Sequence, residues 1–217
     1  TIAAYFLANH YVIQRAEDRF EFRAQEITRA ITDRMNVYEQ VLWSTAGFMN
    51  ASEDVRRDEF ATFVETLDIN TQWPGIQGIG LSIPVTPDDL QAHIQTIRAE
   101  GFPDYNVKPA GERDLYSAII YLEPFDWRNK RAFGYDMWSN DMRRQAMMRA
   151  RDMGMAATSG IITLVQETSE DVQRGFLMYV PVYKTRDIPD SQQEREAQFL
   201  GWVYSPFRSR DLMSGIL

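Results

Sequence analysis

The 217-residue sequence contains no cysteine, which excludes a disulfide framework and any metal site built on thiolate ligands. It has only two histidines, His10 and His93, far apart in the chain and in differently patterned segments. Two scattered histidines are expected to be surface residues rather than ligands of one metal. The sequence therefore predicts no metal site and no cofactor.

Basic residues are outnumbered by acidic ones, 23 to 31, and the formal net charge is −8. An acidic surface repels phosphate backbones and anionic lipid headgroups, so we expect no nucleic-acid partner and no electrostatic docking on a membrane. A covalent membrane tether is not excluded by charge. The composition, 44% hydrophobic and 25% charged, is typical of a globular domain and argues against a disordered or fibrous chain.

The apolar segment at the start, residues 1–8, is far shorter than the roughly 20 residues that a membrane-spanning helix requires. Tyr5 lies within it and Tyr11 follows it, and tyrosines are common at a membrane interface. Two interpretations stay open. The segment is either the last turn of a membrane helix or the start of an amphipathic helix that packs on its own domain.

Glycine and proline are absent from residues 15–46, where apolar residues recur every three or four positions. This spacing places them on one face of a helix, and the pattern runs well beyond the roughly 8–20 residues of a usual globular helix. The sequence therefore predicts a long stalk helix. Its apolar row is Ile27, Ile31, Met35, Tyr38, Leu42, Ala46 and Met49.

The rest of the chain alternates short helical and strand patterns. Helices are predicted at 58–67, 87–97 and 141–153, and strands at 76–83, 105–107, 117–122, 161–165, 175–180 and 199–204. A polar loop is expected at 184–196. Consecutive strands with helices grouped outside them predict an α+β fold around an antiparallel sheet, the general form of PAS-like domains.

Signatures of catalysis are missing. There is no Gly-x-Ser-x-Gly segment, and Gly75, Gly78 and Gly80 lack the spacing of a phosphate-binding loop. Carboxylate pairs such as Asp88–Asp89 lie at helix starts or in loops, where solvation or capping explains them. The methionines of segment 141–155 lie at helical spacing and are interpreted as core residues rather than a soft-metal site. We expect no enzyme.

Asp136 stands apart because it lies in an apolar neighbourhood, Phe133-Gly-Tyr-Asp-Met-Trp138. A carboxylate there requires hydrogen-bond partners or a shifted pKa. One interpretation is an aspartate that caps a helix or orders a loop. The other is a carboxylate at an apolar pocket that accepts hydrogen bonds from a ligand.

Several motifs together resemble the CHASE domain, the extracellular sensory module of sensor histidine kinases and cyclases. The resemblance covers most of the chain. Its motifs are Tyr38-Glu-Gln-Val-Leu42, Trp73-Pro-Gly-Ile-Gln-Gly-Ile79, Gly111-Glu-Arg-Asp-Leu-Tyr116, Tyr121-Leu-Glu-Pro124, Gly134-Tyr-Asp-Met-Trp-Ser139, Arg143-Arg-Gln-Ala-Met-Met-Arg-Ala-Arg-Asp152 and Gly175-Phe-Leu-Met-Tyr-Val-Pro-Val-Tyr-Lys184.

The resemblance implies a stalk helix over residues 1–50 and a membrane-distal PAS-like ligand-binding subdomain over 51–185. Residues 186–217 would begin an incomplete membrane-proximal PAS-like subdomain. It further implies a homodimer through the stalk, flanking membrane helices and a cytoplasmic kinase or cyclase. The chain would then be the periplasmic part of an inner-membrane receptor.

Plant members of the family bind cytokinins, which are N6-substituted adenines, and an aspartate matching Asp136 holds the adenine N–H groups. The resemblance thus implies a small-molecule ligand, cytokinin-like or another purine or heteroaromatic compound, held by Asp136 and Thr158. Strand position adds candidate pocket walls: Tyr121, Phe133, Met178 and Tyr179. The alternative is a PAS-like module that binds a protein partner and has no small-molecule ligand.

Overall fold

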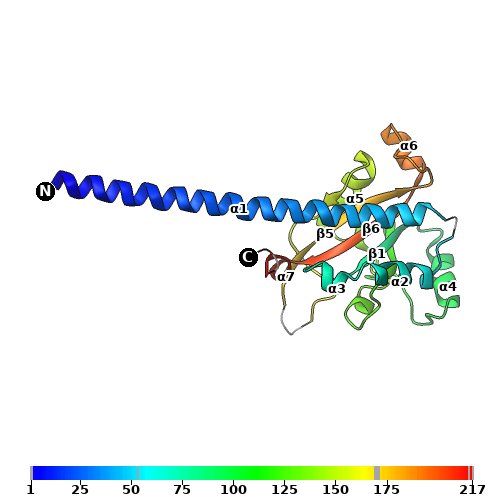
Figure 1. Cartoon of the computed structure of the whole chain (residues 1–217). Coiled ribbons are helices and arrows are strands. Elements are labelled where there is room, and N and C mark those ends of the chain that lie inside the picture. Colours follow the sequence, from blue (N-terminus) through cyan, green and yellow to red (C-terminus); the bar gives the residue numbers. More distant parts are fainter. Residues whose placement is uncertain (1, 53, 169–171, 215, 217) are drawn as a thin grey trace.

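The computed structural model describes residues 2–52, 54–168, 172–214 and 216, with the side chains of residues 2–8 and 70 left undescribed. A single helix, α1 (Ile2–Asn50), runs through the first 49 of these residues and is about 70 Å long at 1.5 Å per residue. Its first part protrudes from the domain and its last part lies along it (Figure 1). The predicted stalk helix is confirmed. The expected position of Tyr5 at a membrane interface lies outside the described side chains.

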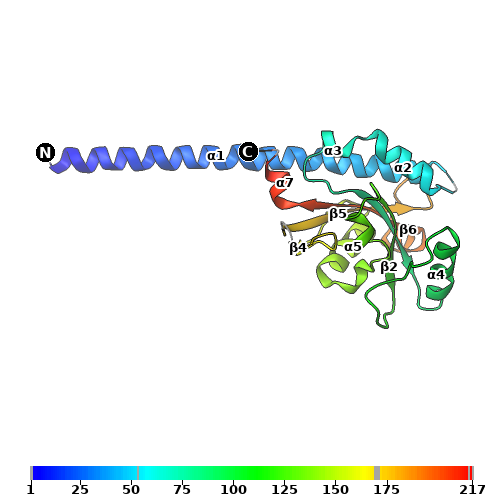
Figure 2. The same cartoon turned by 90° about the horizontal axis from the view of Figure 1, so that it is seen from below.

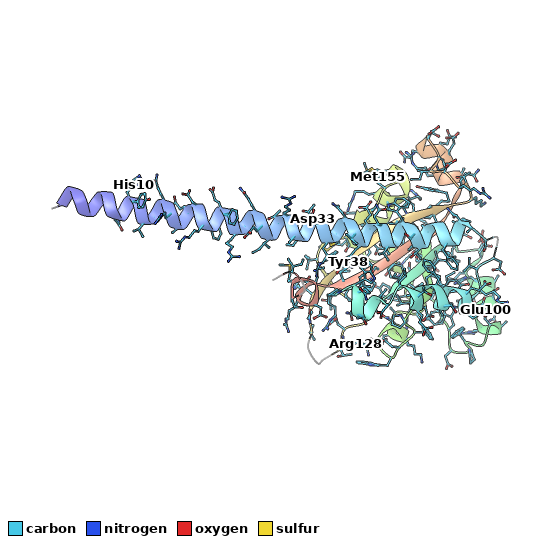
Figure 3. All side chains as sticks on the ribbon, in the orientation of Figure 1. His10, Asp33, Tyr38, Glu100, Arg128 and Met155 are labelled. Atoms are coloured by element: carbon cyan, nitrogen blue, oxygen red, sulfur yellow. The ribbon has the colours of Figure 1, made fainter. Side chains whose placement is uncertain are left out.

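None of the described helices is long and apolar enough to cross a membrane. The protruding part of α1 carries many polar side chains, His10 among them, while Tyr38 lies against the domain (Figure 3).

The domain is built on one antiparallel sheet of six strands in the order β2-β1-β6-β5-β3, with β4 also paired to β5. The predicted α+β fold is therefore confirmed. The strands are β1 (Ile79–Val85), β2 (Tyr116–Glu123), β3 (Ala157–Thr158), β4 (Ile162–Thr163), β5 (Arg174–Tyr183) and β6 (Phe199–Arg208).

The predicted start of a second subdomain at residue 186 does not match this pairing. Strand β6 lies between β1 and β5 and bonds to both, with Val203 opposite Leu81 on one side and Val180 on the other. Residues 199–208 therefore complete the same sheet as residues 79–183. Local patterns identify a strand but not its neighbours, which is why the boundary was misplaced.

Three local predictions also need correction. Residues 105–107 form no strand, because Tyr105 and Val107 pack into a small core beside helix α4 (Leu90–Ala99). In segment 161–165 only Ile162 and Thr163 pair with β5. The expected loop 184–196 includes the start of helix α6 (Gln192–Ala197), which Ser191 caps by accepting a hydrogen bond from the Glu194 N–H.

Helices cover both faces of the sheet. Figure 2 shows α1, α2 (Arg57–Thr66) and α3 (Ile69–Gln72) on one side and α5 (Asp141–Met153) on the other. The sheet strands β5 and β6 contact α1 on one side and α5 on the other. Three short helices complete the described part: η1 (Asn129–Arg131), η2 (Met137–Ser139) and α7 (Ser209–Ser214).

Strands β5 and β6 divide their side chains between two cores, because successive residues of a strand point to opposite faces. The stalk face packs the end of α1 against Met178, Val180, Val182, Val203 and Phe207. The opposite face packs η2 and α5 against Leu177, Tyr179, Trp202 and Tyr204.

The end of α1 joins the stalk-face core through the predicted apolar row. The Tyr38 ring stacks on Phe207 with 5.4 Å between ring centroids, and its hydroxyl donates to the Pro74 carbonyl at 2.6 Å. Leu42, one turn further, is fully buried. This part of α1 is therefore a core element of the domain.

Leu42→Ala is expected to destabilise the domain by about 2–5 kcal/mol, because it leaves a cavity between α1 and the sheet. Val37→Ala is the matched control, since Val37 lies on the same helix and is 45% exposed. Chemical denaturation followed by circular dichroism measures both. Equal losses in the two variants would contradict the packing described here.

Candidate functional site

Asp136 lies at the N-cap of η2 and is fully buried. One carboxylate oxygen, Oδ1, accepts hydrogen bonds from the backbone N–H groups of Ser117 at 2.8 Å and Trp138 at 3.0 Å. The preceding turn needs glycine: Gly134 has φ +76°, and a Cβ there would lie against the Asn106 carbonyl oxygen. Asp136 thus ties β2 to the start of η2.

The other carboxylate oxygen of Asp136, Oδ2, lies 3.3 Å from Nε of Arg113 and accepts no hydrogen bond. Burial raises the pKa of Asp136 above its ordinary value, whereas the Ser117 N–H and the Arg113 charge act in the opposite direction. These contacts match the loop-ordering interpretation of this aspartate. Its role in binding a ligand stays a prediction.

The other predicted site residues are dispersed over the molecule. Met178 and Tyr179 are both buried but lie on opposite faces of the sheet, so they do not line one common pocket. The Tyr121 hydroxyl donates to the Val55 carbonyl at 2.8 Å, and the residue borders a pocket of about 230 Å³ beside the end of α1. Thr158, in β3, is exposed.

Phe133 lines a groove of about 570 Å³ between the segment after α4 and the segment after β2. Its ring makes edge contacts with Phe102 and Phe125, at 4.9 and 5.2 Å between centroids. Lys108 and Lys130 also border this groove. It is therefore an aromatic groove with a basic rim, away from Tyr179 and the opposite-face core.

A different group of polar side chains is buried on the opposite face. Arg143, in α5, is 4% exposed and donates to the Tyr135 hydroxyl at 2.9 Å and to the Thr163 carbonyl at 3.2 Å. Its guanidinium carbon also lies 4.9 Å from the Tyr135 ring centroid. Within the described residues, Arg143 forms no ion pair with a carboxylate.

Two fully buried tyrosines of β5 and β6 share this face. Tyr179 and Tyr204 have ring centroids 6.2 Å apart. The Tyr179 hydroxyl donates only weakly, to Sδ of Met137 at 3.5 Å, and the Tyr204 hydroxyl has no hydrogen-bond partner among the residues that the structure describes. Burial raises the pKa of both phenols, and the Arg143 charge lowers it by less. We call Tyr135, Arg143, Tyr179 and Tyr204 the tyrosine–arginine cluster.

Sequence analysis did not select Arg143, although its position carries a signal. It precedes Ala146, Met147 and Ala150 by three, four and seven residues, which places it on the buried face of α5. Sequence analysis instead counted Met142 among the core residues, although it is 51% exposed. The interpretation of the methionines as core residues holds for Met147, whereas the structure exposes Met142, Met148, Met153 and Met155.

No group of three or more metal-binding side chains is found in the described part of the chain. His93 instead shares a hydrogen bond with the Tyr105 hydroxyl at 2.9 Å, and His10 is exposed on α1.

The chain matches a family model and is similar to solved structures. A family model described as "CHASE domain" matches residues 53–217. Among solved structures, the chain is similar to an "Extracellular ligand binding receptor from Desulfohalobium retbaense DSM5692", with 12% identity and a TM-score of 0.47. The match covers 87% of this chain and 25% of that one. No curated protein matches the chain.

Asp136→Ala is expected to destabilise the domain by about 2–4 kcal/mol, because it removes the acceptor of two backbone N–H groups. Asp136→Asn retains an acceptor oxygen and should lose much less of the free energy of unfolding. Asp141→Ala, at the exposed start of α5, is the control. Thermal unfolding at pH 7 measures all three, and equal stability of Asp136→Ala and wild type would contradict the anchoring role.

The raised pKa of Asp136 also predicts a pH dependence. Between the ordinary value of 3.8 and the raised folded value, the folded protein binds a proton that the unfolded chain does not. This group therefore makes stability fall as pH rises through that window. Asp136→Asn should remove that part of the dependence, as measured by unfolding between pH 4 and 7.

Proposed function

Since this chain belongs to the CHASE domain family, a family of sensory rather than catalytic domains, we propose that it is the extracytoplasmic small-molecule-sensing domain of a transmembrane receptor. One observation carries the proposal. The tyrosine–arginine cluster and the end of α1 lie on opposite faces of the same two strands, β5 and β6. A ligand on one face is thus one strand thickness away from the helix on the other.

Coupling between the two faces follows from strand geometry. Tyr179 faces the cluster, while its neighbours Met178 and Val180 pack in the core beside α1. Because both faces are buried and close-packed, a shift of Tyr179 moves residues that contact α1. A ligand changes the population of two such arrangements only by the difference in its affinity for them.

The receptor proposed here resides in an inner membrane, with the domain in the periplasm and membrane helices beside it. Its cytoplasmic output domain would be a histidine kinase or a nucleotide cyclase. Helix α1 would connect the periplasmic domain to the membrane helices. The resemblance to receptors of this family supports this arrangement, together with a helix that protrudes well beyond the domain (Figure 1).

Homodimerisation through α1 is part of the proposal. The apolar row that packs Tyr38 and Leu42 onto the sheet continues on the protruding part of α1 as Phe20, Ile27 and Ile31. Phe20 is 76% exposed. An exposed apolar row on a long helix is stabilised when a second helix packs against it, and a second copy of the same chain presents an identical row.

Phe20→Glu is expected to convert the dimer into a monomer, because it places a charge in the proposed helix–helix contact. Arg19→Glu introduces the same side chain at the adjacent exposed position and should leave the dimer intact. Light scattering on the whole chain measures the mass of each. A monomeric wild type would reject the homodimer, whereas a dimeric Phe20→Glu would show that the contact lies elsewhere.

A thermal-shift screen against adenine derivatives and other small heteroaromatics, neutral and anionic, tests the sensing function. A ligand at a hundredfold excess over its dissociation constant adds about 2.7 kcal/mol of stability. For a domain of this size, that corresponds to a rise in Tm of about 5–10 °C. Repeating a hit with Asp136→Asn tests that residue separately. The absence of any hit would reject the small-molecule sensor.

The second candidate is a module that binds a protein partner and has no small-molecule ligand. The exposed methionines of and beside α5, Met142, Met148, Met153 and Met155, are the observation that favours it. Flexible exposed methionines suit protein-binding surfaces. If the ligand screen gives no hit, the protein-binding module becomes the favoured function.

A further inference from the structure

We propose that the ligand of this domain carries a carboxylate group and that Arg143 binds this carboxylate within the tyrosine–arginine cluster. The inference rests on the proposed sensing function and specifies the ligand's chemical class.

The two buried arginines of the described chain differ in how their charge is compensated. Arg208 is 6% exposed and pairs with Glu167 at 2.8 Å and Asp211 at 2.9 Å. Arg143 is as deeply buried, yet its contacts within the described residues are a neutral hydroxyl and a backbone carbonyl. A buried cation without an anion costs several kcal/mol. A bound carboxylate would supply the missing charge.

The hydroxyl groups of the cluster are hydrogen-bond donors that lack a strong acceptor within the described residues. Tyr204 has an unpartnered hydroxyl, and Tyr179 donates only to a thioether sulfur, a weak acceptor. The Tyr135 hydroxyl accepts from Arg143 and retains its own proton to donate. Because donors outnumber acceptors here, the group that completes the cluster is an acceptor with negative charge.

A carboxylate fits better than other anions. The planar guanidinium matches two carboxylate oxygens in a bidentate pair. The surroundings of the cluster are apolar, with Trp202, Met137, Leu164 and Leu177 in the same core, which suits an organic body attached to the carboxylate. A neutral purine held by Asp136 would leave the Arg143 charge uncompensated.

Strand β4 contacts the cluster through Arg143. This strand pairs with β5 at Ile162 and Thr163, and the Thr163 carbonyl is one of the two acceptors of the Arg143 side chain. A carboxylate that replaces this carbonyl on Arg143 would displace β4. Binding is thereby linked to β5, which contacts α1 on its other face.

Matched acid and amide probes test the proposal: acetate and acetamide, benzoate and benzamide, indole-3-acetate and indole-3-acetamide, with inorganic phosphate as a further anion. The whole chain is tested as wild type, Arg143→Met and Arg144→Met. Arg144 is the control, a more exposed arginine of the same helix that pairs with Asp141. At least one carboxylate should raise the Tm of wild type and Arg144→Met by about 5 °C or more at saturation.

The amide partner of that carboxylate should leave the Tm unchanged, and Arg143→Met should weaken binding on the order of 100-fold. Retention of the shift in Arg143→Met, or a shift by phosphate alone, would overturn the proposal. Neutral heteroaromatic hits without any carboxylate hit would leave the sensor function standing and reject this inference. No hit of either kind rejects both.

The free protein provides a second readout that needs no ligand. Removal of an uncompensated buried cation should leave the Tm of Arg143→Met equal to wild type or higher, whereas Arg208→Met leaves a buried Glu167 unpaired and should lower it strongly. Arg143→Gln, which keeps hydrogen-bond donors without the charge, serves if Arg143→Met does not fold. A large drop in Tm for both Arg143 variants would show that Arg143 stabilises the fold, and it would overturn the proposal.

Discussion

Burial of both faces of strands β5 and β6 is the constraint on which the rest of the structure depends. Their alternate side chains belong to two cores, one shared with the end of α1 and the other with η2 and α5. In a close-packed interior neither core can rearrange without the strands that separate them. The packing of α1 on one face and the packing of η2 and α5 on the other therefore both depend on the position of strands β5 and β6. This arrangement suits a domain that reports a binding event through a helix.

Buried charged groups of this domain differ in whether they face an opposite charge. Asp136 lies beside Arg113, and Arg208 pairs with Glu167 and Asp211. Within the described residues, Arg143 has hydrogen bonds but no carboxylate partner, and the Tyr204 hydroxyl has no hydrogen-bond partner. Buried polar groups in folded proteins are nearly always paired, and this difference is the basis of the proposal that a carboxylate binds at Arg143.

Much of the fold could be predicted from the sequence, and the failures share one cause. The apolar row of α1, the helix 141–153 and the strands 175–180 and 199–204 all follow from local periodicity. The misplaced subdomain boundary, the absent strand at 105–107 and the exposed Met142 depend on which element packs beside which. Side-chain spacing contains no information about those neighbours.

By itself the sequence determined the long helix, the antiparallel α+β character, the lack of metal and nucleophile motifs and the family resemblance, because these depend on residue types and spacing along the chain. Only the tertiary structure decided that β6 lies inside the sheet, that Met178 and Tyr179 face different cores, and that Arg143 is buried without a carboxylate among the described residues. Those facts arise from contacts between segments far apart in the chain. Charge compensation, in particular, is a property of three-dimensional surroundings.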